Sequence, residues 1–161
     1  MRRFIGLGAV GLALAFLFCP TAVLAGEEEL LPVLAQYEQA FEAGDAEALG
    51  DLYWHDERLT VFWPEPETAF RVDGWTQWQS YLKGFAAFIS QLPPGGSNLE
   101  IRQPTITVIG DVAIVTSYWV GTMLIPQAGS QVMQGRETLV WKKIDGQWVI
   151  IHEHASLFPT P

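Results

Sequence analysis

The C-terminal half of the chain consists of long runs in which apolar and polar residues alternate. Short turn sequences separate these runs, at Gly110-Asp111 and at Asp145-Gly146. Alternation with a period of two is typical of a strand that buries one face. Asp-Gly between two such runs favours a two-residue hairpin turn. The pattern predicts successive antiparallel strands, which span 99–109, 112–125, 131–143 and 147–156.

Helical patterns precede these strands. Apolar residues recur every three or four positions in the segments 27–43, 46–54 and 74–90, as expected for amphipathic helices. Gly44-Asp45 separates the first two, because Gly ends helices and Asp caps the next one. Helices followed by an antiparallel meander predict an α+β domain, in which three N-terminal helices pack on a curved mixed or antiparallel sheet of about six strands. Two short predicted strands between the helices span 59–63 and 69–72.

The first 25 residues have the three-part pattern of a secretory signal peptide. Arg2-Arg3 supplies the positive charge, residues 4–18 are uninterruptedly apolar, and Ala25 is a small residue suited to cleavage. The apolar run is shorter than the about 20 residues that a membrane-spanning helix needs. We therefore expect cleavage after Ala25, with one domain, residues 26–161, released into the periplasm or the medium.

Composition excludes several classes of function. The chain has a formal net charge of −9, and loss of Arg2 and Arg3 would make it more acidic. Such a surface repels nucleic acid and anionic lipid, so we expect neither as a partner of the mature chain. The single cysteine, Cys19, lies in the predicted signal peptide. Disulfide and thiolate chemistry are therefore not expected in the mature domain.

Several local strings resemble those of a known superfamily. They are FEAGDAEAL at 41–49, VDGW at 72–75 and, with most specificity, GRETLVWKKIDGQWVIIHEHAS at 135–156. Together they resemble the nuclear transport factor 2-like superfamily, in its SnoaL-like branch, and they are similar to the association domain of calmodulin-dependent protein kinase II. The resemblance covers nearly all of the mature chain.

The resemblance implies a cone, in which a strongly bent sheet wraps three helices and leaves a pocket at one end. Members commonly form homodimers through the outer face of the sheet. They include isomerases, dehydratases, cyclases and non-catalytic binding or assembly domains, so the fold does not settle the function. The sequence contains neither a phosphate-binding loop nor a dinucleotide-binding fingerprint, so we expect no cofactor. Where the kinase association domain has pocket arginines, this chain has Trp119, Leu139 and Ala155.

The Asp145-Gly146 turn predicts which residues of the last hairpin face each other. A two-residue turn places Glu137 opposite His154, Leu139 opposite His152 and Trp141 opposite Ile150, all on one face. On the other face, Arg136 and Glu153 would be diagonal neighbours able to form an ion pair.

The predicted Glu137–His154 pair has two interpretations. A carboxylate beside an imidazole raises the histidine pKa, and the pair could act as a general base. The other interpretation, which we favour, is a structural pair that fixes strand register. With His152 added, the set has the composition of a metal triad, but no second cluster supports this, and we expect no metal.

Seven tryptophans suggest an aromatic pocket in addition to a filled core. Such a pocket would suit a flat, apolar or aromatic molecule. We expect an exported domain that binds a small organic ligand, with two alternatives: an isomerase, dehydratase or cyclase using His154 or Glu137 as base, and a non-catalytic dimerisation module. The candidate ligand-binding residues are Trp63, Trp75, Trp78, Trp119, Arg136, Leu139 and His152.

Overall fold

The computed structural model describes residues 21–64 and 69–158, so most of the predicted signal peptide lies outside the described residues. The order of elements confirms the order expected from the sequence. The helices are α1 (Thr21–Ala43), α2 (Ala46–Asp51) and α3 (Trp75–Ile89). The strands are β1 (Thr60–Pro64), β2 (Ala69–Asp73), β3 (Ser97–Ile109), β4 (Val112–Ile125), β5 (Gly129–Ile144) and β6 (Gln147–Leu157).

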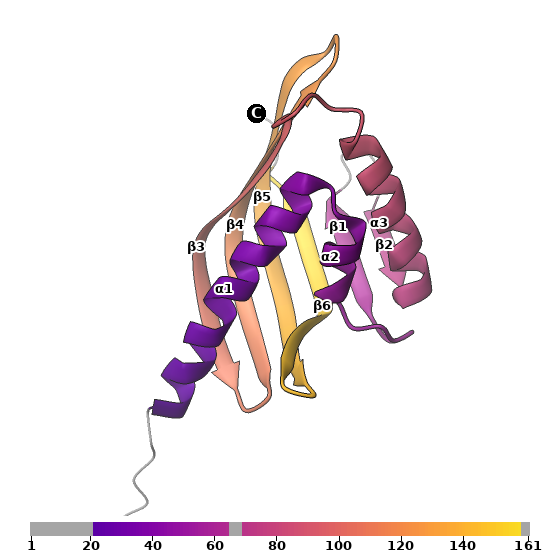
Figure 1. Ribbon diagram of the computed structural model, residues 1–161. Helices are drawn as coiled ribbons and strands as arrows, with labels where there is room; N and C mark the ends of the chain where they lie inside the picture. The colour runs from indigo at the N-terminus through magenta and orange to yellow at the C-terminus, as the bar shows by residue number, and fades with distance from the viewer. Residues whose placement is uncertain (1–20, 65–68, 159–161) are drawn as a thin grey trace, which may run out of the picture.

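The strands form one curved, six-stranded sheet in the order β2-β1-β6-β5-β4-β3. All neighbouring strands are antiparallel except β1 and β6, which are parallel, so the sheet is mixed. The helices lie on its concave side, with α1 crossing it diagonally (Figure 1). The α+β cone is therefore confirmed, and the concave side is called the inner face and the convex side the outer face.

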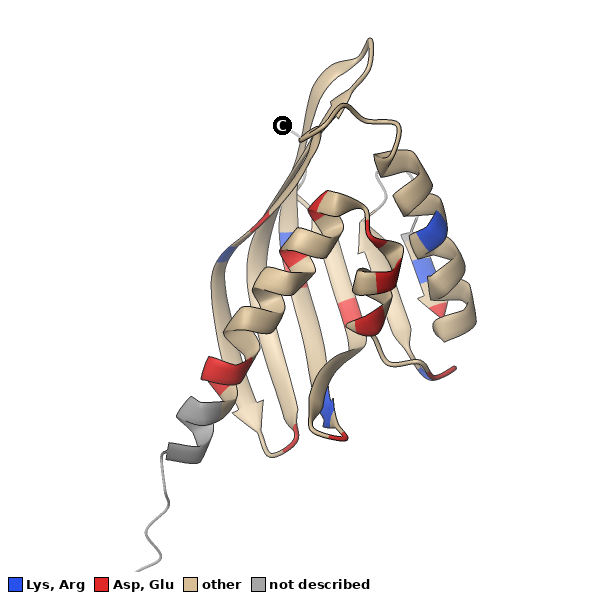
Figure 2. Ribbon diagram, viewed as in Figure 1, with Lys and Arg blue, Asp and Glu red and all other residues tan. Residues whose placement is uncertain are grey.

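The core fills the space between the inner face and the helices. Trp78 of α3 and Trp141 of β5 are fully buried there, as are Leu139 and Ile150. Along β4 and β5 the buried residues alternate with more exposed ones, as expected for strands with one covered face. Charged residues lie mostly elsewhere, and Figure 2 shows acidic residues on α1, α2 and the hairpin turns.

The last hairpin has the predicted turn but also contains a bulge. Asp145 and Gly146 have φ angles of 51° and 84°, as a type I′ turn requires. Trp141 pairs with Ile150, as predicted, but the next pair is Val140 with His152. Ile151 is the extra residue of a β-bulge, which reverses the faces of all later residues of β6.

Within the described residues, no helix combines the length and the apolar character needed to cross a membrane.

Candidate functional site

The bulge at Ile151 overturns the predicted pairing of Glu137 with His154. Glu137 pairs with Ala155, and His154 pairs with Thr138. Glu137 is buried on the inner face, whereas His154 is exposed on the outer face. The two side chains therefore cannot act together on one molecule inside the cone. The catalytic roles predicted for them stay predictions, but the pair itself was wrong.

The same shift brings a second carboxyl group into the cone. Glu153 is fully buried, and it lies on the inner face together with Glu137. The predicted ion pair between Glu153 and Arg136 is therefore wrong, because Arg136 points outward. Glu153 is held by Tyr53, whose hydroxyl donates a hydrogen bond to Oε2 of Glu153. Tyr37 of α1 donates a longer one, 3.4 Å, to Oε1 of Glu137.

Burial controls the protonation of this inner cluster of Tyr37, Tyr53, Glu137 and Glu153. Loss of hydration disfavours the charged carboxylate, and it raises the pKa of Glu137 to about 7. The pKa of Glu153 is raised well above its usual value, first by burial and then by the charge of Glu137. Burial and the nearby carboxyl groups also raise the pKa of both tyrosines. At neutral pH the cluster therefore retains protons that exposed glutamates would have lost.

Several polar atoms of the interior have no hydrogen-bond partner among the described residues. They include Oε2 of Glu137, Oε1 of Glu153 and Oγ of Ser117, which faces Glu137 across β4 and β5. A buried polar group without a partner costs about 1–3 kcal/mol. The cluster is thus a place where stability is given up, which is a common property of functional sites.

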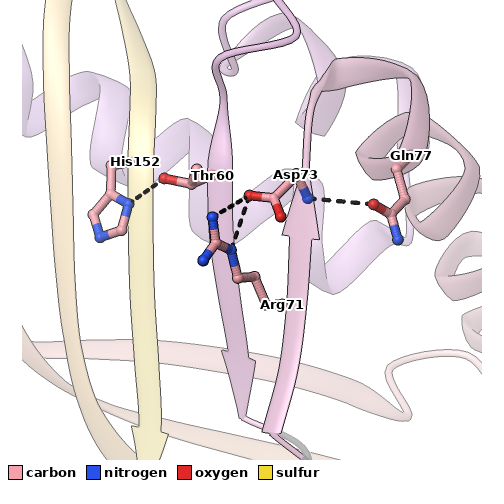
Figure 3. Close-up of polar contacts among 5 residues, drawn as sticks. All are labelled: Thr60, Arg71, Asp73, Gln77 and His152. Carbon is pink, nitrogen blue, oxygen red and sulfur yellow. Dashed lines mark hydrogen bonds and ion pairs between the residues drawn. The ribbon is translucent and has the colours of Figure 1, made fainter.

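Two other predicted site residues of β5 and β6, Arg136 and His152, lie on the outer face. His152 is half-buried, and its Nδ1 lies 2.6 Å from Oγ1 of Thr60 on β1 (Figure 3). Burial and the nearby His154 lower the pKa of His152. Arg136 is exposed, and its guanidinium carbon lies 5.3 Å from the ring centre of Phe158. The structure brings neither residue into the cone.

The predicted aromatic pocket residues are divided between core and surface. Trp78 and Leu139 are fully buried, and Trp119 is almost so, with its Nε1 donating to the carbonyl oxygen of Arg136. Trp63 is half-buried, with its ring centre 5.5 Å from that of Trp78. Trp75 stacks on His55, with their ring centres 3.9 Å apart. Their role in ligand binding stays a prediction.

One sizeable groove contains none of the predicted ligand-binding residues. It has a volume of about 950 Å³ and lies between α1, the segment after α2 and the β5–β6 hairpin. Glu29 lines this groove, where it accepts hydrogen bonds from Nζ of Lys143 and from Nε1 of Trp148. These contacts tie the hairpin to α1.

Sequence reasoning missed Tyr37, Tyr53 and Glu153 as members of the inner cluster. Tyr37 lies in the predicted helix 27–43, where it counted only as one of the apolar residues that recur every three or four positions. A sequence signal does exist, because Glu153 is flanked by two histidines in a strand of mostly apolar residues. Within the described residues, no group of three or more His, Cys, Asp or Glu side chains is arranged to hold a metal ion.

The outer face exposes apolar side chains. Seven large apolar side chains are exposed in the described part of the chain, and four of them point outward from β4 and β5. These four, called the outer apolar set, are Ile114, Tyr118, Leu124 and Val132.

Comparison with known proteins agrees with this geometry. A subunit of calcium/calmodulin-dependent protein kinase type II, the delta subunit of Oryctolagus cuniculus, is 31% identical over 139 residues, which are 86% of this chain but only 25% of that protein. The association domain of the Caenorhabditis elegans kinase superposes with a TM-score of 0.63 at 23% identity, over 84% of this chain and 98% of that chain.

A nuclear transport factor 2-like protein from Salmonella enterica superposes with a TM-score of 0.69 at 23% identity, over 85% of this chain and 94% of that chain. At this identity the structural likeness establishes the fold alone. The sequence profile of the calcium/calmodulin dependent protein kinase II association domain matches residues 26–159. This chain therefore belongs to the calcium/calmodulin dependent protein kinase II association domain family, and it shares its fold with nuclear transport factor 2-like proteins.

Proposed function

We propose that the chain is an exported association domain, in which two copies pair through the outer face to form a homodimer. The observation that supports this most is the outer apolar set, which no helix or strand of the described chain covers. Pairing would remove these side chains from water, which is the main driving force of protein association. Exposed apolar side chains that gather on one face favour an interaction site there.

Analytical ultracentrifugation of the mature chain tests this pairing. We expect the mass of two copies, and we expect Tyr118→Glu with Val132→Glu to give monomers, because pairing would bury both charges. Leu31→Glu is the matched control, since Leu31 is similarly exposed but lies on α1. Wild-type protein that stays monomeric at high concentration would refute the pairing. A dimer that persists after the double substitution would show that the two copies pair through another face.

Export is supported by the charged, apolar and small-residue pattern of residues 1–25. Expression of the full chain in a bacterial cell, followed by N-terminal sequencing, tests it. We expect a mature N-terminus at Gly26 in the periplasmic or secreted fraction, and accumulation of the precursor for Ala25→Phe. An intact Met1 on cytoplasmic protein would contradict export.

A small organic ligand in the cone is the second candidate function. The unpartnered oxygens of Glu137, Glu153 and Ser117 favour it, because a polar ligand could supply the missing hydrogen bonds. Such a ligand would have to displace side chains that now cover the cluster. We therefore rank ligand binding below homodimer formation as a candidate function. An enzymatic role, with Glu137 as base, is open only on this condition.

A ligand screen by tryptophan fluorescence tests this second function. Ligand binding in the cone should change the emission of the buried tryptophans and should be lost in Glu137→Gln. His154→Ala should bind as the wild type does, because His154 lies outside the cone. Equal loss in both variants would argue against a site at the inner cluster. The kinase activity of the longer relative is not proposed, since the chain spans only 25% of that protein.

A further inference from the structure

The outer face also contains a groove of about 450 Å³ over β3, β4 and β5. Ser117 and Glu137 border it, but both side chains are buried on the inner face. The outward-facing side chains of the groove are polar and can all donate hydrogen bonds. They are Gln103, Thr105, Thr116, Tyr118, Arg136 and Thr138.

Strand register builds this groove from two adjacent rows of side chains. One row runs Thr105–Thr116–Thr138, and the next runs Arg102–Tyr118–Arg136. Opposite residues of neighbouring strands have their Cβ atoms about 5 Å apart, so three hydroxyl groups lie beside a guanidinium group. Between the rows β3 has an irregularity, where Gln103 takes a φ of 52°.

Arg136 is the cation of this groove, and it lacks a carboxylate partner among the described residues. Arg58, Arg71 and Arg102 each form an ion pair within 2.6–2.8 Å. The carboxylate on the adjoining outward row, Glu100, is the one held by Arg102. The guanidinium group of Arg136 lies against the ring of Phe158, which leaves the N–H donors at its edge for a ligand.

We propose that this groove binds a small oxyanion, the carboxylate or phosphate group of a small molecule, on Arg136. A guanidinium group presents paired N–H donors that match the two oxygens of such a group. The hydroxyls of Thr105, Thr116 and Thr138 complete the donor set. The volume lies within the range of small-ligand sites, about 300–1,000 Å³. Binding in the groove does not itself depend on the pairing of copies.

Pairing through the outer face would make the anion more important. It would take Arg136 out of water, and a buried charge without a counter-charge is strongly unfavourable. A bound oxyanion would neutralise it, so anion binding and pairing should strengthen each other. This coupling, unlike the site, rests on the proposed pairing.

Isothermal titration of the mature chain with inorganic phosphate and, separately, with acetate tests the site. We expect saturable binding that Arg136→Gln weakens by at least about tenfold, since the charge and the paired N–H donors of the guanidinium group are both lost. Arg136→Lys should retain part of it. The matched control is Lys142→Gln, another cation on the outer side of β5, and it should stay within about twofold of the wild type because only diffuse attraction is lost.

Comparison of phosphate with acetate shows whether the site prefers a phosphate or a carboxylate group. Tighter binding of either anion supports the site. The absence of saturable binding of both would overturn it. Equal weakening by Arg136→Gln and Lys142→Gln would also overturn it, since it would show general attraction to positive charge. Ultracentrifugation in the same buffers separates the two proposals. A monomer that binds the anion keeps the site and rejects the pairing, whereas a dimer without anion binding does the opposite.

Discussion

The two faces of strands β5 and β6 differ in what their side chains can do. On the inner face, Glu137 and Glu153 are buried with Tyr37 and Tyr53, and none of these residues is more than 6% exposed. On the outer face, a step of one residue away, Arg136 and His154 are exposed. The inner groups therefore affect stability and its pH dependence, whereas the outer groups are available for recognition.

This difference shows that chemical type alone does not identify a site. Carboxyl and imidazole groups alternate along β6 as His152, Glu153 and His154. Their surroundings differ because alternate residues of a strand face opposite sides. The substitutions below compare one face with the other, and they are ordered by the size of the expected effect.

The largest difference is expected between neighbours on β5. Leu139→Ala removes a fully buried side chain and should lower the free energy of unfolding by about 2–5 kcal/mol. Thr138→Ala, one residue away on the outer face, should change it by less than about 1 kcal/mol. Urea denaturation of both variants measures this. Similar losses in both would mean that the outer face of β5 is packed as tightly as the inner one.

Stability should fall as the pH rises from about 4.5 to about 7. The folded pKa of Glu137 is raised to about 7 from 4.5, so the folded state binds more protons than the unfolded state in this window. Its contribution is complete below the unfolded pKa and is lost as the pH passes the folded pKa. A shift of this size corresponds to a change on the order of 3 kcal/mol.

Comparison of wild type with Glu137→Gln isolates this pH effect. The lowered pKa of His152 also affects the pH dependence, but His152 is present in both proteins and its contribution cancels in the difference. The free energy of unfolding of the wild type, minus that of Glu137→Gln, should decrease steadily from about pH 4.5 to about pH 7. A difference independent of pH would show that Glu137 titrates as an exposed glutamate does.

Removal of one hydroxyl group from each face should give a smaller difference in the free energy of unfolding than the two changes above. Tyr53→Phe leaves the buried Glu153 without its hydrogen-bond donor, which should cost about 1–3 kcal/mol. Tyr118→Phe on the outer face should cost less than about 0.5 kcal/mol, because water replaces its contacts. Thermal unfolding of the two variants at pH 6 measures both. A neutral Tyr53→Phe would mean that Glu153 finds another donor.

The smallest effect is expected for His154→Ala. His154 is exposed beside Phe62, with ring centres 5.3 Å apart, so stability should change by less than about 0.5 kcal/mol. A loss above about 2 kcal/mol, measured by urea denaturation, would place the histidine in a packed environment. It would then contradict the assignment of His154 to the outer face.

The hairpin shows how far sequence reasoning reached. Asp145 and Gly146 predicted the turn, and the pairing of Trp141 with Ile150 followed from it and is confirmed. The prediction then failed at Ile151, because a bulge has no requirement for a particular residue type at this position. The predicted face is reversed for every residue of β6 beyond the bulge. Glu153 therefore points into the cone, and His154 does not lie beside Glu137.

The tryptophans show a second limit. Their number predicted an aromatic interior, and Trp78, Trp119 and Trp141 are indeed buried. Their number could not show which rings fill space and which border a cavity, because that depends on how the helices close over the sheet. Trp75, predicted as a ligand contact, stacks on His55, and its role in ligand binding stays a prediction.

The sequence by itself determined the elements, their order and the turn of the last hairpin, because these depend on local periodicity and on the backbone freedom of residues such as Gly146. Only the tertiary structure decided which carboxyl group enters the cone. The shift in register sets Glu153 inward, where Tyr53 from a segment 100 residues earlier meets it. The free energy of that contact depends on two distant segments at once, so neither segment alone encodes it.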